Sequence, residues 1–159
     1  MPLSAGEDVC AVEGFLGTHA GYLSDLNLTI QIVMGLALIV GAILAQAKRF
    51  VAHGICQTTV LLLNLVMISI SMWPSFYSHV LPRLPKRLGR RFYAVATIHG
   101  FLGLLAEVLG LYIVLAAGTK ILPETWRFKR WKLWMRIELA LWWCVLLMGA
   151  VTYWVWYAG

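Results

Sequence analysis

Two ionisable residues, His99 and Glu107, lie within one apolar stretch that is long enough to cross a lipid bilayer. The stretch runs from residue 93 to residue 118 and reads YAVATIHGFLGLLAEVLGLYIVLAAG. About 20 apolar residues span the ~30 Å of hydrocarbon in a bilayer. Ionisable side chains are costly at that depth and commonly mark a functional site. These two residues are therefore the first candidates for chemistry.

Glu107 lies ~12 Å along the expected helix from His99, close to the bilayer midplane. Desolvation penalises the charged form of a carboxyl group, so we expect it to be protonated or paired with a donor. Asn64 in the preceding apolar stretch or Tyr153 in the last one is the expected partner. Glu107 and Asn64 are thus a possible proton or polar site. A face of small residues on the same helix lets a neighbouring helix approach; it comprises His99, Gly103, Gly110 and Ala117.

The other three histidines lie near the ends of apolar stretches, where they could meet a ligand. Antiparallel spans would place His19, His79 and His99 at the outer membrane face and leave His53 alone at the inner face. Imidazoles from different helices can hold a metal such as copper, or a haem b. We predict a metal or haem site formed by His99, His79 and His19, with His53 as a possible second site. The competing interpretation is that His19 and His79 are ordinary interfacial residues.

The composition indicates an integral membrane protein. Of 159 residues, 61% are hydrophobic and 13% are charged, whereas soluble domains have about 25% charged residues. We predict an all-α fold, a four-helix bundle that forms a single membrane domain over residues 1–159. The expected spans are about 28–47, 51–73, 92–117 and 133–156.

The sequence also predicts the N-terminal segment and the ends of the first two spans. Residues 1–26 do not resemble a signal peptide and are expected to lie along the membrane interface. Asp25 or Asn27 would cap the first span, and Gln31 would be an interfacial polar group. The second span should end at Trp73, because prolines at positions 74, 82 and 85 forbid a continuous helix.

The net charge of +6 is explained by short basic connections rather than by nucleic-acid binding. Basic residues concentrate on the cytoplasmic side of membrane proteins and meet anionic lipid headgroups. Five lie in the second connection, and eight lie on the opposite side: Lys48, Arg49, Lys120, Arg127, Lys129, Arg130, Lys132 and Arg136. We predict both termini outside, in a bacterial or archaeal inner membrane.

Motifs of familiar enzymes are missing from the sequence. It contains no Gly-rich phosphate loop, no HExxH pair and no nucleophile elbow. Cys10, Cys56 and Cys144 have no short spacing, so neither a disulfide framework nor a CxxC metal motif is expected. The sequence also gives no sign of an inverted repeat with broken helices, which disfavours a transporter. We therefore do not expect an enzyme.

Residues 30–157 resemble a family of small four-helix membrane proteins catalogued as domain of unknown function 420. The resemblance is carried by His53, by FYSHV with His79, by ATIHGFLGLLAE with His99, and by the RFKRWKLWMRIELALWW and MGAVTYWVWY stretches. The family has a fourth histidine in the basic segment before the last span, where this chain has Trp131. Some members are implicated in maturation of haem-copper oxidases, which implies work near haem or copper.

Three functions are compatible with these observations. The first is an accessory or assembly subunit of a respiratory or other redox complex that binds haem or a metal near the outer face. The second is a small b-type cytochrome or quinone-reactive subunit for electron transport, with His99 as axial ligand and Glu107 handling a proton. The third is a purely structural subunit of a larger membrane complex, for which the glycine faces and tryptophan belts are sufficient.

Overall fold

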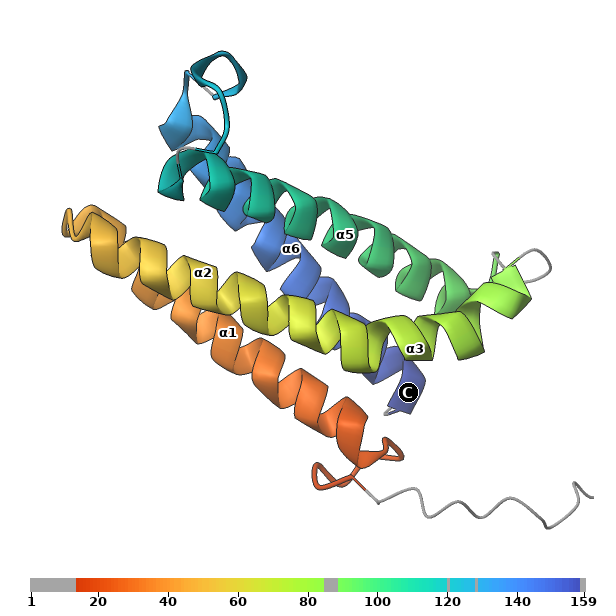
Figure 1. The fold of residues 1–159 in the computed structure, drawn as a ribbon. Helices are drawn as coiled ribbons and strands as arrows, with labels where there is room; N and C mark the ends of the chain where they lie inside the picture. The colour runs from red at the N-terminus through yellow and green to blue at the C-terminus, as the bar shows by residue number, and fades with distance from the viewer. Residues whose placement is uncertain (1–13, 85–88, 120, 128, 158–159) are drawn as a thin grey trace, which may run out of the picture.

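The computed structural model describes residues 14–84, 89–119, 121–127 and 129–157 and confirms an all-α fold. Four of its helices are long and apolar enough to cross a membrane. Figure 1 shows them as a bundle formed by α1 (Tyr22–Gln46), α2 (Phe50–Met67), α5 (Arg91–Gly118) and α6 (Trp131–Tyr157). Cys10, Pro85 and Lys120 lie outside the described residues.

The second helix does not end at Trp73, so this expectation was wrong. It continues from α2 through η1 (Ile68–Met72), α3 (Trp73–Ser75), η2 (Phe76–Val80) and η3 (Leu81–Arg83). Both η1 and η2 are π-helical. The wider π turns carry the chain past Pro74, which lacks an N–H group for the usual α-helical bond. As a result, His79 lies on a helical extension and not in a loop.

Each helix packs against two neighbours. α1 contacts α2 and α6, and α5 contacts α6 and α2. The Gln57 side chain of α2 packs on the α1 backbone at Gly41, where an added Cβ would lie 2.2 Å from Gln57 Nε2. The apolar core between the four helices comprises Met34, Leu38, Val60, Leu61, Ala106, Trp142 and Val145.

The outward faces of the helices are strongly apolar, as contact with lipid requires. Large hydrophobic side chains are exposed on every span, among them Ile32, Leu36, Val51, Phe101, Leu104, Leu147 and Trp154. Water would be a poor solvent for such a surface, whereas bilayer hydrocarbon matches it. The chain is therefore an integral membrane protein whose helices contact lipid.

The segment before α1 is held against the end of α6 by hydrogen bonds to Asp25 and Tyr153. The expected side-chain cap from Asp25 or Asn27 was wrong, because α1 begins one turn earlier, after Gly21, without such a bond. Asp25 is instead fully buried. Its carboxylate accepts a bond from the Leu16 backbone N–H at 2.7 Å and another from the Tyr153 hydroxyl.

Two further bonds join the same segments. Thr18 Oγ1 lies 2.6 Å from the Tyr153 hydroxyl oxygen, and Ser24 Oγ donates to the Tyr157 hydroxyl at 3.0 Å. The part of the N-terminal segment that the structure describes is thus a cap docked on the bundle at the end where α1 begins and α6 ends. Asp25 is the central acceptor of that cap.

Replacing Asp25 with alanine should destabilise the protein, because it removes the acceptor of the Leu16 N–H and one of the two partners of the Tyr153 hydroxyl. The free energy of unfolding can be measured in detergent micelles by following circular dichroism during denaturation. Glu124→Ala is the control, since Glu124 is exposed in a connection. A loss in D25A no larger than in the control would contradict the assigned role of Asp25.

Candidate functional site

Polar side chains from all four long helices lie in the interior of the bundle. Gln31 of α1 donates through Nε2 to Asn64 Oδ1 of α2 at 3.2 Å. Asn64 Nδ2 in turn donates to Glu107 Oε2 of α5 at 2.8 Å. On α6, Trp142 Nε1 donates to Glu138 Oε1 at 2.8 Å. The sequence-predicted pair of Glu107 and Asn64 is thus brought together.

Glu107 lies deep in the bundle. Its residue exposure is 3%, and at 1.5 Å per residue it lies roughly 24 Å from the start of α5 and 16 Å from its end. Glu138 lies roughly 10 Å from the start of α6 by the same measure. Because α5 and α6 are antiparallel neighbours, the two carboxyl groups reach similar depths from the same end of the bundle.

The two carboxyl groups form a pair across the interface between α5 and α6. Glu138 Oε1 packs at Gly110, which lies one helical turn after Glu107 on α5. Each one uses one oxygen to accept a bond, from Asn64 or from Trp142, and keeps the other oxygen buried without a hydrogen-bond partner. These unpartnered atoms are Glu107 Oε1 and Glu138 Oε2. Two carboxyl groups in apolar surroundings can share a proton or hold a cation, but can hardly both carry a bare charge.

Gly110 provides the space for this pair. A Cβ atom at this position would lie 2.8 Å from Glu138 Oε1 and 2.8 Å from Leu61 Cδ1. The predicted face of small residues therefore lies against α6, where Gly103 also approaches Val145. The absence of a side chain at residue 110 lets Glu138 turn inward, toward α5.

Two members of the site were not recognised as such in the sequence. Gln31 was expected at the interface, but α1 begins at Tyr22 and so places Gln31 well inside the bundle. Glu138 lies one helical turn before Trp142, a spacing that brings a donor beside a carboxyl group and could have singled it out. Tyr153, the other expected partner of Glu107, binds Asp25 instead.

The four histidines have separate surroundings. The His99 ring packs on α6, where it hydrogen-bonds the backbone of Val145 and leaves its Nδ1 buried without a partner. His79 is exposed, and its Nδ1 lies 2.8 Å from Ser78 Oγ on its own helix. His19 is exposed in the N-terminal cap. His53 Nδ1 lies 2.8 Å from the carbonyl oxygen of Gly41.

Within residues 14–84, 89–119, 121–127 and 129–157, no three His, Cys, Asp or Glu side chains are grouped so that they could hold a metal ion. The three-histidine metal site is therefore not assembled in this structure. A ligand shared by two of the histidines, whether haem b or copper, stays a prediction. Cys56 and Cys144 are free thiols.

No protein-family model, curated protein or solved structure matches this chain. The resemblance to the domain of unknown function 420 family stays a prediction for the same reason.

Replacing Gly110 with alanine should destabilise the protein by about 1–3 kcal/mol, because the added methyl group displaces Glu138 or Leu61 from a packed interface. Gly54→Ala is the matched control, since an added Cβ in that helix meets nothing within 4 Å. The control should be neutral or slightly stabilising because alanine favours helix. Unfolding in micelles, followed by tryptophan fluorescence, compares the two. Equal stabilities would show that α5 and α6 do not meet closely at Gly110.

Proposed function

We propose that this protein is an accessory subunit of a larger membrane complex and that its Glu107–Glu138 pair binds and releases a proton inside the bilayer. The observation that carries the proposal is the pair of buried carboxyl oxygens, Glu107 Oε1 and Glu138 Oε2, that have no hydrogen-bond partner. A proton held between two such oxygens would satisfy both. A cation would be the alternative occupant of the same space.

The fixed donors favour a single negative charge on the pair. Asn64 donates to one carboxyl group and Trp142 to the other, so one oxygen of each is already satisfied. One bound proton would leave a single negative charge on the pair, stabilised by these two donors. Loss of that proton would leave two like charges in a medium of low dielectric constant, which is strongly unfavourable. The arrangement suits a site that holds its proton until its surroundings change.

Gln31 and Asn64 are positioning residues in this scheme. The bond from Gln31 Nε2 to Asn64 Oδ1 fixes the orientation of the Asn64 amide, with its oxygen toward Gln31. The amide nitrogen of Asn64 then has to face Glu107. A chain of amides does not itself carry a proton at neutral pH, so the role of these two residues is to orient the carboxyl group.

The surface of the bundle supports the role of an accessory subunit. The spans expose large apolar side chains, which either lipid or another membrane subunit can cover. The sequence resemblance favours a respiratory or other redox complex as the host, since such complexes move protons together with electrons. The function of a b-type cytochrome would require a haem ligand such as His99, and the function of a purely structural subunit would require no proton site.

Labelling with a hydrophobic carbodiimide tests the proton site, because this reagent modifies protonated carboxyl groups in apolar surroundings. We expect mass spectrometry of the protein in lipid nanodiscs to find the label on Glu107 or Glu138. The extent of labelling should decrease as the pH is raised, and the E107Q/E138Q variant should lose it.

The exposed Glu124 is the internal control for reagent access and for the behaviour of an ordinary carboxyl group. Labelling of the pair that stays constant at every pH, or a label confined to Glu124, would reject the proton site. The purely structural subunit would then be the better account.

A further inference from the structure

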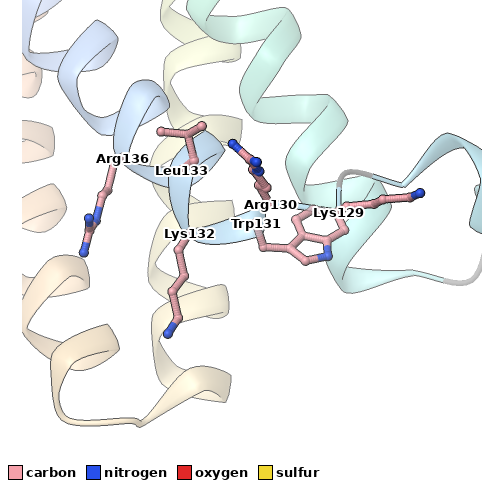
Figure 2. A pocket seen from close by; sticks show the side chains of 6 residues that line it. All are labelled: Lys129, Arg130, Trp131, Lys132, Leu133 and Arg136. Carbon is pink, nitrogen blue, oxygen red and sulfur yellow. The ribbon is translucent and has the colours of Figure 1, made fainter.

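A cavity of about 520 Å³ opens at the start of α6 and is surrounded by positive charge. It is lined by Lys129, Arg130, Trp131, Lys132, Leu133 and Arg136. Four of these six residues are cations, and none is a carboxylate. Figure 2 shows Lys132 and Arg136 extending to one side of the first turns of α6 and Lys129 extending to the other. The cavity is shallow and open to the surroundings of the protein.

The position of the cavity indicates where its ligand would come from. The start of α6 lies at the same end of the bundle as the connection between α1 and α2, which carries Lys48 and Arg49. From this end inward, the spans are apolar and expose large hydrophobic side chains to lipid. The cavity is therefore at the level where the hydrocarbon of a bilayer gives way to its headgroups.

We propose that this cavity binds the headgroup of an anionic phospholipid that carries more than one phosphate. Lys132 and Arg136 extend to the same side of α6, and with no acid in the lining they call for a ligand with more than one negative charge. Arg136 can donate two parallel hydrogen bonds to a phosphate, and Lys132 adds a point charge that reaches it on a flexible stem. Leu133, 47% exposed, offers an apolar contact for the acyl chains below the headgroup.

The tryptophan in the lining suits the same ligand. Trp131 begins α6 and is half-buried at the cavity wall. Indole rings prefer the interfacial region, where an apolar ring and a polar N–H group can both be accommodated. Trp131 would therefore anchor this end of α6 at the depth where the phosphates of the lipid lie.

Native mass spectrometry of the protein released from nanodiscs tests this assignment. The nanodiscs contain phosphatidylcholine with either cardiolipin, which has two phosphates, or phosphatidylglycerol, which has one, at equal total charge. We expect the wild-type protein to retain cardiolipin preferentially. The K132Q/R136Q variant should retain it about 10- to 30-fold less well. Each basic residue near an anionic membrane surface strengthens binding roughly three- to fivefold, and the variant removes two of them.

The matched control is K48Q/R49Q, which removes the same charge from the same end of the bundle but at a separate cavity. We expect this control to change cardiolipin retention less than about twofold. An equal loss in both variants would overturn the proposal in favour of general surface charge. Equal retention of the two lipids, or displacement of cardiolipin by inorganic phosphate, would also overturn it, the latter by assigning the cavity to a free anion. Circular dichroism verifies that both variants keep their helices.

Discussion

The bond from Asn64 to Glu107 decides how these four apolar helices can pack. In a bilayer the hydrophobic effect does not distinguish one apolar helix face from another, because lipid tails are as apolar as leucine. A buried carboxyl group does distinguish them, since it must find a donor or pay a large desolvation cost. The 2.8 Å contact therefore fixes α5 against α2. Gln31 extends the same constraint to α1, and Glu138 meets it from α6.

Polar groups act at three levels of the bundle. At the end where α1 begins, Asp25 and Tyr153 hold the N-terminal cap on α6. In the interior, Gln31, Asn64 and Glu107 join α1, α2 and α5 by hydrogen bonds, and Glu138 of α6 lies against Gly110 of α5. At the opposite end, cations line the cavity at the start of α6. The apolar residues between these levels fill space and face lipid, while the polar ones set rotation and register.

The sequence predicts the helices well because length and hydropathy are local properties. Four spans and a buried partner for Glu107 can both be predicted from it. It cannot show that π turns carry the second helix past Pro74, because that outcome depends on hydrogen bonds that shift along several residues. It also places Gln31 too close to the membrane surface, because the depth of this residue depends on where α1 begins.

The remaining features depend on three-dimensional contacts. Glu138 becomes a partner of Glu107 only because Gly110 leaves room for it across the interface. Asp25 could serve as a helix cap in isolation, yet in the fold the Tyr153 hydroxyl from the far end of the chain donates to it. The histidines differ from these residues, because the sequence predicts a common site for three of them but the structure gives each one separate surroundings.

Infrared spectroscopy of the protein in nanodiscs tests the central claim most directly, because a protonated carboxyl group has a C=O stretching band distinct from the bands of a carboxylate. At neutral pH, the wild-type protein should show this band, shifted by deuterium exchange and lost in the E107Q/E138Q variant. The presence of the same band in that double variant, or its absence from the wild-type protein, would contradict a proton held by this pair.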